Sequence, residues 1–195
     1  MSKNYKVLIT GCSSGLGKHL AKKFEFEGHK VMRHNGRGHY DISDLDAISA
    51  LCLEAKRFGV DALVNNAAIV CPSLQFENYD TQMICNMIDV NLRAPIILTN
   101  TLIGDLKKVV NINSMVGLEV KSPRTLYSAT KWGLRGFSNS LKKENSNLSV
   151  LDVYPTNIQT TPDRLNAMDI DMVVNKIYES FMNDESELVL DGRKQ

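Results

Sequence analysis

A tyrosine and a lysine four positions apart, Tyr127 and Lys131 in the segment YSATK, could together carry out acid–base chemistry. Residues at positions i and i+4 lie on the same face of a helix. An ammonium group beside a phenol favours the phenolate, so Lys131 should lower the pKa of Tyr127 from about 10 toward neutral pH. A tyrosine with such a pKa can donate or accept a proton during a reaction.

Ser114 stands thirteen residues before Tyr127, at the predicted carboxyl end of a strand. Its hydroxyl could donate a hydrogen bond to a substrate oxygen on which negative charge develops. Taken alone, such a serine is most often a turn residue, and a tyrosine–lysine pair at this spacing is common in amphipathic helices. The chemistry therefore depends on a fold that brings these side chains together.

A glycine-rich loop near the start of the chain, TGCSSGLG, holds Gly11, Gly15 and Gly17 between a predicted strand and a predicted helix. Glycine lets the backbone approach an anion closely, and the N-terminus of a helix offers free N–H groups with partial positive charge. The loop therefore suits a pyrophosphate group. A tight turn selected only for packing is the alternative interpretation of the same glycines.

The chain alternates between short apolar strands and amphipathic helices. The predicted strands cover residues 5–10, 29–34, 60–66, 107–114, 148–155 and 186–192. The predicted helices cover residues 18–28, 43–59, most of 76–105, 127–144 and 171–182. Ser43 is the expected N-cap of the second helix, and Pro95 is expected to kink or break the long one. Apolar strands that alternate with helices predict a doubly wound α/β fold, in which helices cover both faces of a parallel sheet.

The composition is that of an ordinary globular protein, with 43% hydrophobic and 23% charged residues. A net charge of +1 gives no excess field to attract nucleic acid or a membrane surface. The sequence has neither an apolar run of about 18 residues nor the apolar core of a signal peptide. Its four cysteines lack metal-ligand spacing, so we expect no metal site and reduced thiols in a cytoplasmic protein.

The order of these motifs resembles that of the short-chain dehydrogenase/reductase family, in the branch whose first turn reads TGxxxGxG. NNAA at 65–68 is similar to the family's NNAG, and DVNL places Asn91 inside the long helix. INS and YSATK carry the serine, the tyrosine and the lysine, and YPTNIQT at 154–160 resembles the family's PGxxxT stretch. The resemblance covers essentially the whole chain. It implies that residues 1–195 form a single NAD(P)-binding domain, a Rossmann-like three-layer αβα sandwich.

The resemblance also implies a reaction, the transfer of a hydride between a nicotinamide and a small carbonyl or alcohol substrate. Tyr127 would exchange a proton with the substrate oxygen, Ser114 would polarise that oxygen, and Lys131 would also bind the nicotinamide ribose. Asn91 would hold a water that connects Lys131 to solvent as a proton relay. The cofactor would contact a larger set of residues: Gly11, Ser13, Ser14, Gly15, Leu16, Gly17, Asn35, Arg37, Asp41, Ile42, Asn65, Ala67, Tyr127, Lys131, Pro155, Ile158 and Thr160.

The end of the second predicted strand favours NADP over NAD. In the family an acidic residue there binds the ribose hydroxyls of NAD, whereas a basic residue pairs with the 2′-phosphate of NADP. Asn35 occupies the position of that acidic residue, no carboxylate follows before Asp41, and Arg37 is close by. NAD remains the alternative, in which Arg37 is only a surface turn residue.

The connection after the second predicted strand is unusually short. About eight residues separate that strand from the DISD segment at 41–44, whereas a parallel crossover through a helix needs at least about ten to twelve. The helix that the family places between its second and third strands should therefore be missing. Asn35-Gly36 is also a hairpin signal, so the segment could instead reverse locally.

The substrate side of the site also departs from the family. Residues of about 156–170 leave room only for a minimal substrate loop. Thr156 and Ala68 stand where the family has glycine, and both are tolerated if φ is negative. The apolar residues within 115–120 could line a substrate pocket or could pack as a loop.

The family also implies an assembly, because its members dimerise through the helices expected here around 76–105 and 127–146. We therefore expect a homodimer. Two other functions keep the same fold. One is a non-catalytic dinucleotide-binding regulator or scaffold, which the short substrate loop favours. The other is an epimerase or dehydratase with the same tyrosine and lysine, although such relatives usually carry GxxGxxG and a larger carboxyl-terminal lobe.

Overall fold

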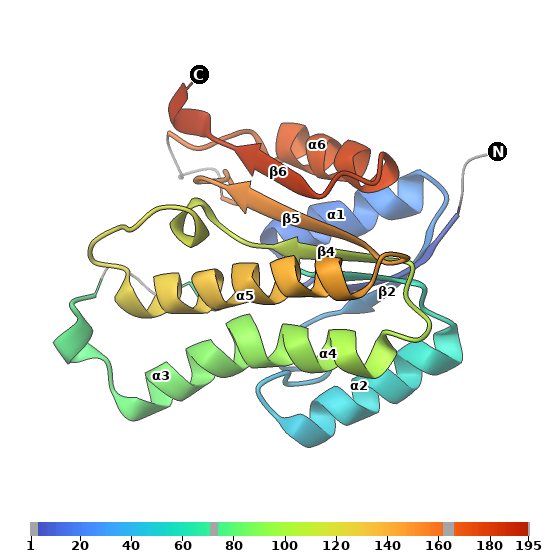
Figure 1. The fold of residues 1–195 in the computed structure, drawn as a ribbon, viewed down its shortest axis with the longest axis horizontal. Helices are drawn as coiled ribbons and strands as arrows, with labels where there is room; N and C mark the ends of the chain where they lie inside the picture. The colour runs from blue at the N-terminus through green and yellow to red at the C-terminus, as the bar shows by residue number, and fades with distance from the viewer. Residues whose placement is uncertain (1–3, 71–73, 162–165, 195) are drawn as a thin grey trace.

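The computed structural model describes residues 4–70, 74–161 and 166–194 and is built on one parallel six-stranded sheet (Figure 1). The order of its strands is β2-β1-β3-β4-β5-β6. This order confirms the doubly wound α/β fold, because the chain starts at β1, moves to one edge and then crosses back toward the other. The strands are β1 (Lys6–Thr10), β2 (Lys30–His34), β3 (Ala62–Asn65), β4 (Lys108–Ile112), β5 (Ser149–Pro155) and β6 (Glu187–Leu190).

Helices cover both faces of this sheet (Figure 1). One face packs against α1 and α6, and the other packs against α2, α4 and α5. The helices are α1 (Gly15–Phe26), α2 (Leu45–Phe58), α3 (Thr81–Ile88), α4 (Ala94–Leu102), α5 (Thr125–Glu144) and α6 (Ile170–Met182). Short 3-10 turns are η1 (Phe76–Asn78), η3 (Met115–Gly117) and η4 (Gly192–Lys194).

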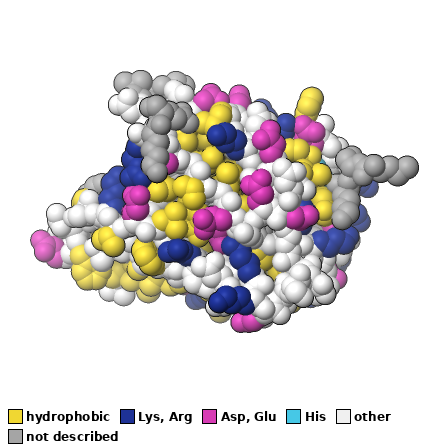
Figure 2. All heavy atoms as spheres, turned by 45° about the horizontal axis from the view of Figure 1, so that its top comes forward, with side chains coloured by type: hydrophobic (Ala, Val, Ile, Leu, Met, Phe, Trp, Pro, Cys, Tyr) yellow, Lys and Arg dark blue, Asp and Glu magenta, His cyan; other side chains and the backbone are white. Residues whose placement is uncertain are grey.

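The pleat of the strands divides the apolar side chains between the two faces. In β1, Val7 and Ile9 join the core beneath α1 and α6, whereas Leu8 joins the core beneath α2 and α4. Leu20 and Phe24 lie on one face of α1 and are fully buried, as their spacing predicts. The face of the molecule drawn in Figure 2 carries Lys, Arg, Asp and Glu side chains interspersed with one another, which agrees with the small net charge.

The connection from β2 to α2 contains no helix within its residues 35–44, all of which the structure describes. This confirms that no helix lies between His34 and Ser43. The strands β2 and β3 are nevertheless connected by a helix, α2, so the expected absence of any helix between the second and third strands is wrong. The chain reverses at Gly36, which has φ +82°, and the N–H groups of His39 and Tyr40 donate to its carbonyl oxygen. The reversal does not lead into a hairpin, because β2 pairs with β1 alone and forms one edge of the sheet.

The start of α2 differs from the expectation by one residue. Its N-cap is Asp44, whose carboxylate accepts a hydrogen bond of 2.8 Å from the Ala47 N–H. The prediction that Ser43 caps this helix is therefore wrong. The Ser43 hydroxyl instead donates a hydrogen bond of 2.7 Å to the Asp41 carboxylate. An ionised carboxylate at the N-cap also interacts favourably with the positive end of the helix dipole, whereas a neutral hydroxyl carries no charge for this interaction.

The break in the long helical segment also lies earlier than expected. A π-helical turn, η2 (Asp89–Arg93), separates α3 from α4. Pro95 lies in the first turn of α4, directly after this π-helical turn. The π-helical turn therefore marks the break, and it contains Asn91.

Candidate active site

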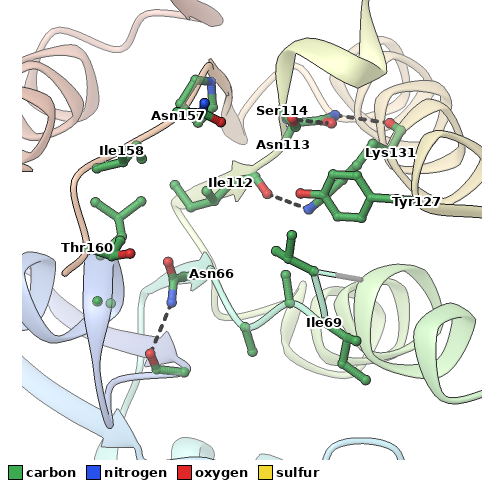
Figure 3. Close-up of a pocket in the computed structure, with 18 of the residues that line it drawn as sticks. Asn66, Ile69, Ile112, Asn113, Ser114, Tyr127, Lys131, Asn157, Ile158 and Thr160 are labelled. Carbon is green, nitrogen blue, oxygen red and sulfur yellow. Dashed lines mark hydrogen bonds between the residues drawn. The ribbon is translucent and has the colours of Figure 1, made fainter. Parts of the chain in front are cut away.

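A cleft of about 960 Å³ opens at the carboxyl ends of the strands. Ligands of doubly wound folds bind at this edge of the sheet. Its lining includes the glycine-rich loop at one end and the predicted catalytic serine, tyrosine and lysine at the other. Figure 3 shows Tyr127 and Lys131 on one side of the cleft and Ile158 and Thr160 on the other. The fold therefore brings the two groups of predicted residues into one cavity.

The glycine-rich loop leaves room for an anion because all three of its glycine positions disfavour a side chain, and Gly11 has φ +72°. A Cβ on Gly17 would lie 2.2 Å from the Gly11 carbonyl oxygen, and Gly15 has φ +53°. Ser14, the N-cap of α1, makes no side-chain capping hydrogen bond. The first N–H groups of α1 therefore have no capping side chain and face a cleft, which fits the pyrophosphate of a dinucleotide. Ser13 and Leu16 also line the cleft.

The predicted catalytic side chains come from two elements. Ser114 follows β4, and Tyr127 and Lys131 lie one turn apart in α5. The Lys131 ammonium is 5.7 Å from the centre of the Tyr127 ring and donates a hydrogen bond of 2.8 Å to the Ile112 carbonyl oxygen. Its side chain is 2% exposed, and burial lowers the pKa of Lys131 to about 8.

Asn113 joins these two elements, and the sequence analysis missed it. Its Oδ1 accepts a hydrogen bond of 2.9 Å from the Ser114 N–H, and its Nδ2 donates to the Lys131 carbonyl oxygen at 3.2 Å (Figure 3). A Cβ on Gly117 would lie 2.6 Å from the same Oδ1. Asn113 thus holds the end of β4 against the first turns of α5, which sets the spacing between serine and lysine.

Asn91 does not line the cleft. It is 1% exposed, and its side chain is paired with the backbone of Ile69. Its Oδ1 accepts from the Ile69 N–H at 2.7 Å, and its Nδ2 donates to the Ile69 carbonyl oxygen at 2.9 Å. The π-helical turn thus positions the segment after β3 through the contacts of Asn91 with the Ile69 backbone, and the role of Asn91 in holding a relay water stays a prediction.

Two cofactor-binding predictions also lie outside the cleft lining, those for Asn65 and Asn35. Asn65 is the last residue of β3 and points into the core, where its Nδ2 donates to Asn111 Oδ1 at 2.8 Å. The next residue, Asn66, lines the cleft instead and donates to the Thr10 carbonyl oxygen at 2.8 Å. Asn35 is exposed, whereas its neighbour Gly36 lines the cleft.

His34 connects the glycine-rich loop to the turn after β2, and the sequence analysis missed it. Its Nδ1 accepts from the Gly11 N–H at 3.3 Å, and its Nε2 donates to the Tyr40 carbonyl oxygen at 2.7 Å. Burial lowers the pKa of His34 below its ordinary value of 6.5, so the ring is neutral at neutral pH. This neutral form is the one that can accept from Gly11.

Arg37, Asp41 and Ile42 line the same end of the cleft. The Arg37 side chain is 67% exposed, and its Nε lies 3.5 Å from an Asp41 carboxylate oxygen. Hydrogen bonds from the Ser43 N–H and hydroxyl hold the pKa of Asp41 below its ordinary range. The carboxylate is therefore anchored to the start of α2, while the guanidinium remains accessible.

The end of β5 and the segment after it form another wall of the cleft, and Thr160 of this segment lies beside Gly15 of the glycine-rich loop. Pro155, Ile158 and Thr160 line it, as does Ala67 across the cleft. Within the predicted substrate loop, Ile158 and Met168 form a parallel bridge, and residues 162–165 lie outside the described residues.

Neither Thr156 nor Ala68, which stand where the family has glycine, has a positive φ. The loss of glycine therefore causes no backbone strain at these two positions. Met115 and Val116 line the cleft, whereas Leu118 does not and Val120 is 92% exposed. The sequence analysis missed Gly192 and Arg193, which also contribute to the lining.

Among the described residues, no group of three or more His, Cys, Asp or Glu side chains could hold a metal ion. No helix in those parts of the chain is both long and apolar enough to cross a membrane.

Comparisons with known proteins identify the family. The family described as short chain dehydrogenase matches residues 5–169. Nodulation protein G of Rhizobium sp. (strain N33) is 32% identical over 188 residues, which cover 83% of this chain and 76% of that protein. The 3-oxoacyl-[acyl-carrier-protein] reductase FabG of Buchnera aphidicola subsp. Schizaphis graminum (strain Sg) is 30% identical over 181 residues, with coverages of 78% and 73%.

A solved structure supports the fold. The short chain dehydrogenase from Burkholderia cenocepacia J2315, in complex with NADP, superposes with a TM-score of 0.84 at 20% identity. The superposition covers 98% of each chain. Together with the cleft, its glycine-rich loop and the adjoining serine, tyrosine and lysine, these findings show that the chain is an oxidoreductase that belongs to the short-chain dehydrogenase/reductase family.

Proposed function

We propose that this protein reduces a small carbonyl compound to an alcohol with NADPH. The observation that carries the proposal is the convergence of Ser114, Tyr127 and Lys131 in the cleft that also contains the glycine-rich loop. A bound NADPH supplies the hydride. The protein's own residues bind the substrate oxygen and deliver the proton to it.

The proton comes from Tyr127. As the substrate carbonyl carbon accepts the hydride, the Tyr127 hydroxyl gives its proton to the carbonyl oxygen, and the Ser114 hydroxyl donates a hydrogen bond to the same oxygen. The Lys131 ammonium, 5.7 Å from the Tyr127 ring, stabilises the phenolate that remains. Asn91 supports the reprotonation path by fixing the backbone of Ile69 beside this site.

Tyr127→Phe tests this assignment. We expect the variant to lose nearly all turnover, by a factor of about 10² or more, because the general acid is gone. It should still bind NADPH, as measured by fluorescence titration. Tyr178→Phe is the matched control, since Tyr178 lies on α6 and contacts His29 rather than the cleft.

The proposal fails if Tyr127→Phe keeps more than about a tenth of the wild-type rate, because a general acid contributes more than that. NADPH binding without turnover of any compound in a broad carbonyl panel would favour the non-catalytic alternative. Isomerisation or dehydration of a substrate without net oxidation of NADPH would favour the epimerase or dehydratase.

The choice of NADPH rests on the turn after β2. Arg37 is accessible at the end of the cleft where the adenosine ribose would bind, and the described lining there carries one carboxylate, on Asp41. An accessible guanidinium is the side chain that best pairs with a phosphate. Asn35 provides no carboxylate to bind ribose hydroxyls.

Arg37→Glu tests the cofactor preference. We expect the dissociation constant of NADPH to rise at least about tenfold more than that of NADH, because the 2′-phosphate would meet a carboxylate. Isothermal titration with both dinucleotides measures the two constants. Arg57→Glu, an exposed change on α2 outside the cleft, is the control. Equal weakening of both dinucleotides removes Arg37 from the phosphate site.

We further propose that residues 1–195 act as a single domain, as a homodimer, in the cytoplasm. All described strands belong to one sheet, which supports the single domain. Cys12, Cys52 and Cys85 are free thiols in the structure, which suits a reducing compartment. The exposed apolar side chains of α3 and α5 support the dimer.

A further inference from the structure

The segment after β6 forms part of the rim at the substrate end of the cleft. The Gly192 N–H donates a hydrogen bond of 2.9 Å to Thr156 Oγ1, which anchors the segment beside β5. A Cβ on Gly192 would lie 2.7 Å from Met168 Cγ, so the segment is closely packed there. This anchoring places Arg193 in the lining of the cleft.

Arg193 reaches across the rim to a carboxylate on the opposite wall. Its Nη1 and Nη2 donate to the two carboxylate oxygens of Glu119 at 2.9 Å and 3.0 Å. Asp191 fixes the guanidinium from its other side, with contacts of 2.7 Å to Nε and 2.9 Å to Nη2. The Asp191 side chain is 8% exposed, so this second contact is well sheltered. The two terminal nitrogens of Arg193 are thus oriented as a preformed fork for a carboxylate.

The contact with Glu119 is exposed, unlike the contact with Asp191. The side chains of Arg193 and Glu119 are 55% and 50% exposed. Ion pairs with this exposure contribute little to stability, because water and salt screen them. A ligand carboxylate can therefore replace Glu119 while Asp191 keeps the guanidinium in place.

Positive charge predominates among the described residues on this part of the rim. Lys121 and Arg124 line the cleft together with Arg193, and these three cations face two carboxylates, Glu119 in the lining and Asp191 on the other side of the Arg193 guanidinium. The other lining carboxylate, Asp41, lies at the end of the cleft formed by the turn after β2. The substrate end therefore favours an anion.

We propose that the carbonyl substrate carries a carboxylate group, which Arg193 binds in place of Glu119. The inference rests on the proposed reductase function and names its substrate class, an oxo acid. Two parallel N–H donors match the two oxygens of a carboxylate, which provides geometric specificity as well as charge. Glu119 competes with the substrate for the same fork and keeps the guanidinium paired until the substrate arrives.

Matched pairs of substrates test the proposal with the 195-residue chain and NADPH. Acetoacetate and levulinate are compared with their methyl esters, which keep the ketone and remove the charge. For at least one pair we expect kcat/KM to be at least about tenfold higher for the acid, because a charge-assisted bidentate contact is worth at least that factor.

Three variants locate the effect. Arg193→Gln should raise the KM of the acid about tenfold or more and leave the ester within about twofold, since only the acid uses the fork. Arg193→Lys should be intermediate, because it keeps the charge but loses the planar donor pair. Glu119→Gln should lower the KM of the acid by removing the competing carboxylate. Arg57→Gln, exposed on α2, should change nothing.

The outcomes separate this inference from the proposed function. Equal effects of Arg193→Gln on acid and ester, or a preference for the ester, overturn the inference while turnover of the ester upholds the reductase. If neither compound is turned over, titration calorimetry of levulinate into the NADPH complex still decides the inference. Weaker binding to Arg193→Gln than to wild type supports it, and no difference overturns it.

Discussion

At the scale of single residues, Lys131 shows the conflict between stability and function most clearly. Burial lowers its pKa from an ordinary 10.5 to about 8, which corresponds to about 3 kcal/mol against the charged form. Below pH 8 the folded protein carries this penalty, and the penalty disappears as the pH rises from 8 to 10.5. The charge beside Tyr127 is thus retained at a cost to folding.

Lys131→Met makes this cost measurable. We expect the variant to lose turnover, because the phenolate of Tyr127 loses its cation. We also expect wild type to gain up to about 3 kcal/mol of stability relative to the variant as the pH rises through this range. Chemical denaturation of both proteins at pH 7 and about pH 10 gives the difference. A difference that stays constant with pH contradicts the buried ammonium.

The sequence predicted those site residues whose positions follow from local geometry. Tyr127 and Lys131 are one helical turn apart, and Ser114 follows shortly after the buried strand β4, so the fold class alone brings them to one edge of the sheet. For the neighbours Asn65 and Asn66, the sequence offers two identical side chains, and alternation along the chain decides that Asn65 faces the core while Asn66 faces the cleft. The contact of Asn91 with Ile69 depends on a π-helical turn, for which the sequence has no clear signal.

At the scale of secondary-structure elements, chain length predicted the absence of a helix between β2 and α2. The number of residues in this connection could not predict which hydrogen bonds stabilise the turn. His34 bonds to Gly11 and Tyr40, and Ser43 bonds to Asp41, which are contacts of single side chains. The pairing of Arg193 with Glu119 was also unpredictable, because 74 residues separate them and no periodic pattern connects them.

The turn at residues 35–42 should become more ordered when NADPH binds. Within the described chain, the N–H groups of Arg37 and Gly38 have no acceptor, so they should exchange rapidly with solvent. We expect NADPH to slow hydrogen exchange across this turn more than across β4, which is already buried. Mass spectrometry of peptides from both regions measures the change. Slow exchange in the turn without cofactor contradicts the prediction.

At the scale of the whole molecule, the two faces of the sheet differ in how completely their helices bury apolar side chains. On the side of α3 and α5, the exposed fractions are 59% for Phe76, 37% for Met83, 40% for Ile88 and 44% for Trp132. These elements lie next to one another, and α3, η2 and α4 follow in one line beside α5 (Figure 1). Exposed apolar side chains gathered over neighbouring helices are typical of a protein interface.

We therefore expect a homodimer in which α3, α4 and α5 of one protomer pack against those of a second. Light scattering should give twice the mass of 21.8 kDa at concentrations of about tens of micromolar, since interfaces of standard size give such affinities or better. Trp132→Glu should shift the mass toward the monomer, because a carboxylate would be buried at the interface without a partner. Phe26→Glu is the matched control, because Phe26 is 85% exposed at the end of α1, on the other face of the sheet, and should leave the dimer intact. A wild-type protein of monomer mass, or dissociation by Phe26→Glu alone, would place the interface elsewhere or remove it.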